Sequence, residues 1–193
     1  MQIQKCFALV SLLLFVTVAQ AEYQLDNTAS LINFVSIKKA KIGEVHSFKK
    51  LSGGVDKTGL AQLTVDLTSV ETNIVIRNER MQGILFETGM FPSAEVSTQL
   101  SMVTLQTLKP GESLLLPLEF HFKLHGATKM IASTVRVVAL ADGGLLVSSL
   151  APIMLNAADF ALTDGIQQLM TVAKLPSIAS AVPLTFSLVF KSI

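Results

Sequence analysis

The chain has a single cysteine, Cys6, no tryptophan and one tyrosine among its 193 residues. Because no thiol follows Cys6, residues 22–193 can form no disulfide, no thiolate metal site and no cysteine nucleophile. Charged residues make up only 15% of the chain, without a clustered excess of basic side chains. A nucleic-acid surface or a polybasic lipid-binding tail would need such a cluster, so we expect neither.

The N-terminus has the pattern of a secretory signal. Lys5 is the only charged residue before Glu22, the run Phe7–Val18 is almost wholly apolar, and Ala19-Gln20-Ala21 supplies small residues at the positions read by a signal peptidase. The run is shorter than the about 20 residues that a membrane span needs. We therefore expect a signal, residues 1–21, that is cleaved before Glu22 and leaves no integral membrane span. The chain also lacks an N-glycosylation triplet, so the expected compartment is the bacterial periplasm.

The remaining residues, 22–193, read as one domain without linker, repeat or low-complexity segment. Its clearest element is the stretch 117–126, in which apolar and polar residues alternate. Neighbouring side chains of a strand point to opposite faces, so the stretch predicts a strand with one apolar and one wet face. The inward set is Leu118, Phe120, Phe122 and Leu124, and the outward set is Glu119, His121, Lys123 and His125.

Further alternating or apolar runs predict a sheet of about eight strands. We expect strands over Tyr23–Asp26, Ser30–Lys38, Ile42–Leu51, Ala61–Leu67, Pro92–Leu108, Pro117–Gly126, Ala127–Leu140, Leu145–Asn156 and Val182–Phe190. Turns are expected at 56–59, 109–112 and 142–144, and a bend at Ser52-Gly53-Gly54. Pro152 suggests an edge, a bulge or a strand end.

Two segments depart from strand periodicity. Residues 77–86 have apolar residues at helical spacing and predict a short helix that caps one end of the sheet, and residues 157–176 predict a second helical or irregular segment. The fold class is therefore all-β, an antiparallel barrel or sandwich with one or two short helices. An eight-stranded barrel is either filled by its own side chains or holds one small ligand.

The order of several short motifs resembles that of YceI-like proteins over nearly all of residues 22–193. These motifs are Tyr23-x-Leu25-Asp26, Ser30-x-Ile32-x-Phe34, Gly43–Phe48, Leu67-x-Ser69-Val70-x-Thr72, Arg77-x-x-Arg80-Met81, Phe91-Pro92, Leu124-His125-Gly126-x-Thr128-Lys129, Asp142-Gly143 and Asp159-Phe160. Many members carry Arg-Asp-x-His-Leu where this chain has Arg77-Asn78-Glu79-Arg80-Met81, so Asn78 and Arg80 replace the acid and the histidine.

The resemblance implies a lipocalin-like antiparallel β-barrel that holds an isoprenoid quinone or polyprenyl lipid in its interior. We expect no covalent cofactor and no enzymatic activity. The protein would carry or store that lipid, and a homodimer stays open. The alternative is a structural or interaction protein of the cell envelope or of a stress response, whose barrel is filled. The expected apolar lining is Phe34, Leu63, Val65, Leu67, Leu118, Phe120, Phe122, Leu124, Leu184, Phe186 and Leu188, and the expected head-group contacts are Arg77 and Arg80.

The residues themselves offer little catalytic chemistry. His121 and His125 lie about 13 Å apart on a regular strand, too far for one zinc ion whose ligands are about 2 Å away. We interpret both as solvent-exposed. His46 and Ser47 are adjacent on a strand and point to opposite faces, so they cannot form a nucleophile–base pair. The chain has neither a G-x-S-x-G elbow nor a G-x-G-x-x-G loop. An enzyme whose site is assembled from distant residues remains the third reading.

Overall fold

The computed structural model describes residues 21–193, so the expected signal segment lies outside the described residues apart from Ala21, where β1 begins. Twelve strands form one antiparallel sheet. They are β1 (Ala21–Leu25), β2 (Leu31–Lys38), β3 (Ile42–Phe48), β4 (Leu51–Asp56), β5 (Leu60–Asp66), β6 (Val70–Glu71), β7 (Ser93–Gln99), β8 (Ser113–Leu124), β9 (Ala127–Ala139), β10 (Leu145–Ser149), β11 (Ile153–Asn156) and β12 (Ala181–Ser192). The helical elements are η1 (Leu67–Ser69), α1 (Val75–Arg80), the π-helix η2 (Met81–Leu85), α2 (Met102–Gln106), η3 (Ala157–Phe160) and α3 (Thr163–Ala173).

The twelve strands amount to a closed barrel of eight, because four of the barrel strands are each interrupted once. β1 and β2 pair with successive parts of β12. On their other side, β1 pairs with β4 and β2 pairs with β3. β10 and β11 likewise share the other side of β12. The pairing of β1 with β12 closes the ring, so the expected antiparallel β-barrel is confirmed.

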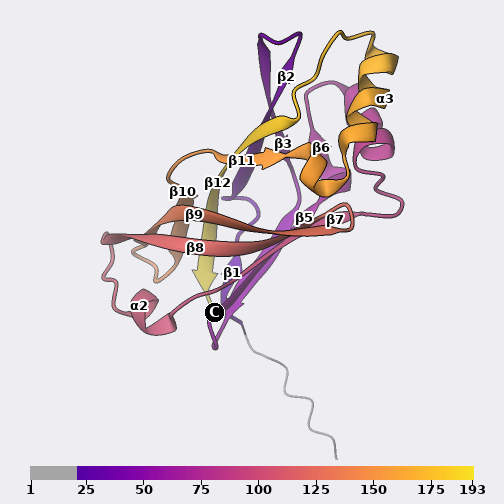
Figure 1. Cartoon of the computed structure of the whole chain (residues 1–193). Helices are drawn as coiled ribbons and strands as arrows, with labels where there is room; N and C mark the ends of the chain where they lie inside the picture. The colour runs from indigo at the N-terminus through magenta and orange to yellow at the C-terminus, as the bar shows by residue number, and fades with distance from the viewer. Residues whose placement is uncertain (1–20) are drawn as a thin grey trace, which may run out of the picture.

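The barrel has two differently covered ends (Figure 1). The β2–β3 hairpin projects at one end, with α3 beside it and α1 behind, and α2 lies at the other end. Lys39 donates its backbone N–H to the Ser177 carbonyl at 3.0 Å, and Ala179 donates to the Ile37 carbonyl at 2.8 Å. The chain that leaves α3 is thereby fastened along the β2–β3 hairpin.

β8 follows the predicted alternation, but it begins at Ser113, four residues before the predicted start, and ends at Leu124. Its even-numbered side chains from Leu114 to Leu124 are half-buried or buried, while the odd-numbered ones are exposed. β8 pairs with β9 from Ser113 to Leu124, as predicted for a hairpin. The inward and outward faces of the barrel wall are therefore set by period-2 alternation.

Three further strand boundaries differ from the prediction. The strand expected over 92–108 ends at Gln99, where Ser101 caps α2 and Leu105 turns inward to 3% exposure. The strand expected over 145–156 is divided into β10 and β11 around Pro152, as a residue without a backbone N–H allows.

The third error concerns the glycine pair. Gly53 and Gly54 lie inside β4, and the break falls before it, at Lys49-Lys50. A Cβ on Gly53 would collide with the carbonyl of Gln62, and one on Gly54 with the carbonyl of Tyr23. The pair therefore permits neighbouring backbones to approach closely, which is a second use of glycine in strands.

Candidate functional site

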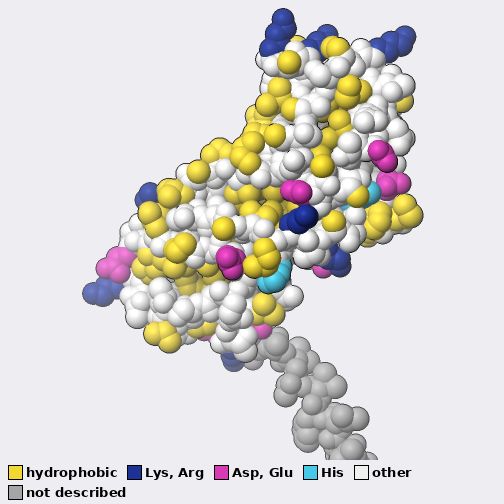
Figure 2. Space-filling view, in the orientation of Figure 1, with side chains coloured by type: hydrophobic (Ala, Val, Ile, Leu, Met, Phe, Trp, Pro, Cys, Tyr) yellow, Lys and Arg dark blue, Asp and Glu magenta, His cyan; other side chains and the backbone are white. Residues whose placement is uncertain are grey.

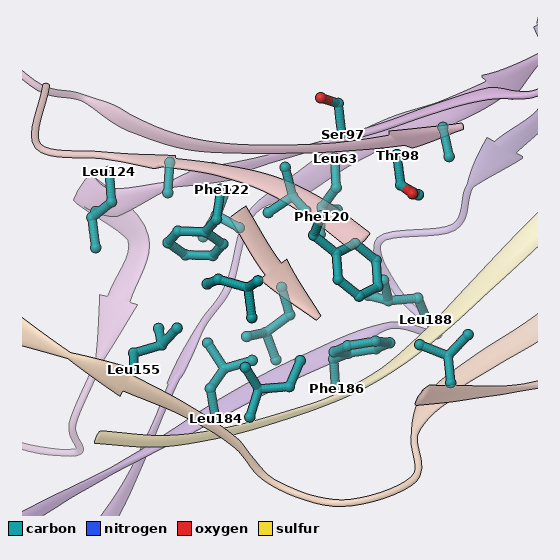
Figure 3. Close-up of a pocket in the computed structure, with 18 of the residues that line it drawn as sticks. Leu63, Ser97, Thr98, Phe120, Phe122, Leu124, Leu155, Leu184, Phe186 and Leu188 are labelled. Carbon is teal, nitrogen blue, oxygen red and sulfur yellow. The ribbon is translucent and has the colours of Figure 1, made fainter. Parts of the chain in front are cut away.

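The barrel encloses an apolar cavity of about 220 Å³. Side chains from strands on all sides of the barrel line it, with Phe120 of β8 facing Phe186 of β12 and Leu155 of β11 near Leu184 (Figure 3). All residues predicted as apolar lining lie on this wall: Phe34, Leu63, Val65, Leu67, Leu118, Phe120, Phe122, Leu124, Leu184, Phe186 and Leu188. Their placement agrees with the prediction, and their contact with a lipid stays a prediction.

The wall offers almost no hydrogen-bonding partner to a ligand. Thr98 is the inward hydroxyl of β7, and it donates to the Glu119 carbonyl at 2.8 Å. The hydroxyl of Ser97 points away from the cavity (Figure 3). A polar ligand group inside this part of the barrel would lose its bonds to water without replacement, which costs free energy. The cavity is therefore suited to hydrocarbon.

Helical elements cover both ends of the cavity, one of them the predicted cap over 77–86 and the other α2, which was expected to be strand. Leu105 of α2 reaches the cavity at one end, while Leu85 and Phe86 of the η2 region and Ile166 of α3 reach it at the other. Phe160 of η3, 2% exposed, packs edge-on against Phe122 with ring centroids 5.3 Å apart. The only sequence signal for these residues was their apolar character within helical segments, which does not distinguish core from lining.

A polar cluster lies directly beyond the cavity on the inner faces of β2 and β3. Ser36 lies two residues after the lining residue Phe34 on β2, and His46 lies two residues before the lining residue Phe48 on β3. Ser36 Oγ is 2.8 Å from His46 Nε2. The ring of His46 is only 3% exposed and lies 5.2 Å from that of Phe34. Burial, reinforced by the charge of Arg77, lowers the pKa of His46, so its neutral form is favoured.

Glu44 joins α1 to this cluster. Its Oε2 atom lies 2.7 Å from Lys38 Nζ and 2.9 Å from Arg77 Nη1. The hydrogen bond from Lys38, followed by that from Arg77, holds the pKa of Glu44 below its ordinary value. Arg77 also donates to the Thr72 carbonyl, so its guanidinium has two protein partners.

Neither predicted head-group residue lines the cavity. Arg77 is directed at Glu44 and Thr72, and Arg80 is half-buried on the last turn of α1. The predicted helix and its place outside the sheet are confirmed, with α1 and η2 together spanning 75–85. The head-group role of both arginines stays a prediction, and for Arg77 the pairing with Glu44 supplies a structural role.

The interpretation of His121 and His125 as solvent-exposed is correct for His121 and wrong for His125. The His125 side chain is only 10% exposed, because it lies in the β8–β9 turn at φ +49° and not on the strand. Its Nε2 atom is 2.7 Å from Glu87 Oε2, and its ring centroid is 4.4 Å from that of Phe91. His125 thus fastens the segment after η2 to the end of β8.

Among residues 21–193 no group of histidine, cysteine and acidic side chains is arranged to hold a metal ion. Over the same residues, no helix combines the length and apolarity needed to cross a bilayer. His46 is paired with Ser36 across the β2–β3 hairpin and not with Ser47.

Comparison with known proteins agrees with this architecture. A 37% identical solved structure, a polyisoprenoid binding domain from Saccharophagus degradans implicated in plant cell wall breakdown, covers 90% of this chain and 100% of its own, with a TM-score of 0.89. Burkholderia cenocepacia BcnA (17% identity, 86% and 98% covered, TM-score 0.66) and a Campylobacter jejuni YceI protein (16%, 79% and 88%, 0.56) share the fold. No curated protein matches the chain. The model of the YceI-like domain matches residues 23–190, and the chain therefore belongs to the YceI-like family.

Proposed function

We propose that this protein binds an isoprenoid lipid, a quinone or a polyprenyl chain, in its barrel and carries or stores it without chemical conversion. The observation that supports this most directly is the apolar cavity, lined from strands on all sides of the barrel. The polyisoprenoid binding domain of S. degradans, 37% identical over 90% of this chain, supports the same ligand class.

The energetics of the cavity favour a hydrocarbon chain. Burial of a CH₂ group contributes about 0.8 kcal/mol, so one five-carbon isoprene unit contributes roughly 4 kcal/mol at most. The cavity of about 220 Å³ lies below the roughly 300–1,000 Å³ of common small-molecule pockets, which favours a slender chain over a bulky ring system. The alternative of a completely filled barrel is not supported by this interior.

The proposal includes export to the periplasm. The charged N-terminus, apolar run and Ala19-Gln20-Ala21 motif support a signal that is removed before Glu22. Cell fractionation combined with mass determination of the mature N-terminus tests this part. A protein that keeps its first 21 residues and stays in the cytoplasm would contradict it.

Native mass spectrometry of protein purified from its own cells, followed by titration with a prenyl quinone, tests the lipid. We expect a copurified or added isoprenoid in a one-to-one complex. The variant Leu118→Trp should weaken binding, because the larger side chain enters the cavity. Displacement of two methylene groups costs about 1.6 kcal/mol, or roughly tenfold in affinity.

Glu119→Trp is the matched control, since Glu119 is the next residue on β8 and points outward. It should bind like the unaltered protein. The proposal is abandoned if no isoprenoid copurifies and none binds on addition. Equal weakening by both variants would place the lipid outside the cavity.

A further inference from the structure

One end of the barrel exposes aliphatic and lysine side chains together. We name it the tip surface and define it by the β2–β3 turn (residues 39–42), the start of α1 (residues 74–76) and the end of α3 (residues 172–174). Its aliphatic members are largely uncovered: Val75 is 74% exposed, Ile76 52%, Ile74 48%, Val172 45% and Ile42 38%. Contiguous exposed apolar side chains on a soluble protein mark interaction sites.

The three segments are held side by side by contacts outside the surface itself. Backbone hydrogen bonds fasten the chain after α3 to the β2–β3 hairpin at Lys39 and Ile37. The Arg77–Glu44 pair, 2.9 Å long, fastens the start of α1 to β3 two residues beyond Ile42. The tip surface is therefore a built feature of the fold.

α1 is hard to explain as a core element. None of its residues is buried, although it begins Val75-Ile76 directly after Ile74. A helix that contributed only solubility would expose polar residues at these positions. The apolar residues at its start are therefore available to a partner.

The charge of the tip surface is positive. Lys39, Lys41 and Lys174 are exposed and have no ion-pair partner within the described chain, and Glu44 is already neutralised by Lys38 and Arg77. Glu79 lies one turn further along α1. In the view of Figure 2, lysine and arginine side chains stand at the upper end of the molecule, and acidic side chains lie lower.

We propose that the tip surface docks on the surface of an anionic phospholipid bilayer. Aliphatic residues that enter the headgroup region, together with lysines that meet lipid phosphates, are the two components of interfacial membrane binding. Lys39 and Lys41 come from the short run Lys38-Lys39-Ala40-Lys41, and the fold brings Lys174 to the same end of the barrel. A protein or nucleic-acid partner would not require this pairing of aliphatic residues with uncompensated lysines.

Docking here would place the cavity close to the bilayer. Phe34 lines the cavity and lies five residues before Lys39, a distance of about 17 Å along a strand. The tip surface would thus serve the exchange of lipid between bilayer and barrel, a purpose that rests on the proposed function. The docking itself does not depend on any isoprenoid.

Sedimentation with vesicles tests the docking. The purified protein should sediment with vesicles of equal parts phosphatidylglycerol and phosphatidylcholine, not with phosphatidylcholine alone, and high salt should release it. Combined Lys39→Glu, Lys41→Glu and Lys174→Glu should weaken this binding by at least about a hundredfold. Combined Lys49→Glu, Lys57→Glu and Lys109→Glu changes the net charge equally but lies outside the tip surface, so binding should be reduced far less.

The absence of tryptophan from the chain allows a test of orientation. Val75 and Val103 are 74% and 73% exposed, on α1 and α2 at opposite ends of the barrel. The fluorescence of Val75→Trp should shift to the blue on addition of anionic vesicles, and that of Val103→Trp should not. The proposal is overturned by any of three results: the protein does not sediment with anionic vesicles, the two lysine variants bind the vesicles equally well, or the two tryptophan variants show the same fluorescence shift.

These outcomes are independent of the cargo, because the vesicles contain no isoprenoid. If the protein binds the quinone but not the vesicles, only the docking proposal is wrong. Vesicle binding without any isoprenoid binding would keep the docking and remove the proposed function.

Discussion

Individual polar residues of the barrel end were the least accessible to prediction from sequence. His46 is 3% exposed and the His125 side chain 10%, although both side chains are polar. Their burial depends on Ser36 and Phe34 in one case and on Glu87 and Phe91 in the other. Such contacts join residues 10 to 38 positions apart, and alternation along one strand carries no information about them.

Burial of His46 makes the stability of the fold dependent on pH. The pKa of His46 is lower in the folded protein than the ordinary value of 6.5. Well above pH 6.5 the ring is neutral in both states, so its titration does not affect stability. Below pH 6.5, His46 binds a proton in the unfolded chain but stays neutral in the folded protein. The free energy of unfolding therefore falls by up to about 1.4 kcal/mol per pH unit until the pH reaches the pKa of the folded protein.

The variant His46→Gln removes this titration while it keeps a hydrogen-bonding group beside Ser36. Urea unfolding of both proteins between pH 7.5 and pH 5 checks the prediction. Relative to the variant, the unaltered protein should lose stability as the pH falls through about 6.5. His121→Gln, at an exposed position of β8, serves as the control. A constant difference between His46→Gln and the unaltered protein over this range would refute the mechanism.

At the scale of elements, alternation predicted which residues face inward but not where the strands break. The breaks of three neighbouring barrel strands lie side by side, at 26–30, 49–50 and 67–69. Asn27 bridges two of them, since it donates to the Lys49 carbonyl and accepts from the Leu51 N–H. The barrel is therefore interrupted along one line across three strands, which no single segment of sequence reveals.

An Asp-x-Thr motif recurs at these breaks and in one hairpin. In each copy a carboxylate oxygen accepts from the backbone N–H and the hydroxyl of the threonine two residues later; the copies begin at Asp26, Asp56 and Asp66. Aspartate commonly forms such turns with its own following backbone. The motif was present in the sequence and could have been used to place two of the breaks.

Asp66 tests the importance of this turn. It caps η1, whose Leu67 is only 2% exposed and lines the cavity. Asp66→Ala should destabilise the fold by about 1 kcal/mol, the usual cost of a lost N-cap. Asp66→Asn keeps the accepting oxygen and should restore most of that loss, although it removes the weak pairing with Lys50 at 3.7 Å. Denaturant unfolding measures both, and an equal loss in the two variants would assign the effect to charge.

At the scale of the whole molecule, the family resemblance and the eight-stranded pattern predicted the closed barrel correctly. The apolar faces of Leu118–Leu124 and Leu184–Leu188 do meet across one cavity. Periodicity alone could not establish that space remains between them, because a filled and a hollow barrel have the same alternation. Helical spacing did predict the cover formed by α1 and η2 at one end, whereas α2 at the other end was expected to be part of a strand.

The cover formed by α3 and η2 allows a last prediction about ligand exchange. Gly165, the third residue of α3, lies so close to η2 that an added Cβ would be 2.9 Å from the Ile84 carbonyl oxygen and 3.0 Å from Leu85 Cα. Both are backbone atoms and cannot rotate away. Replacement of glycine by alanine within a helix stabilises the fold by about 0.5–1 kcal/mol, whereas overpacking destabilises it by about 1–3 kcal/mol. The clash should therefore dominate.

Gly165→Ala should therefore displace α3 from η2 and loosen the cover over Leu85, Phe86 and Ile166. Because the strands that line the cavity are unaltered, a bound prenyl quinone should dissociate several times faster with a smaller change in its association rate. Stopped-flow transfer of the quinone to acceptor vesicles measures the release. Gly83→Ala is the control on η2 itself, since no atom lies within 4 Å of the added Cβ. Faster release in Gly165→Ala but not in Gly83→Ala would identify this cover as the gate, whereas unchanged release would direct the search to the α2 end.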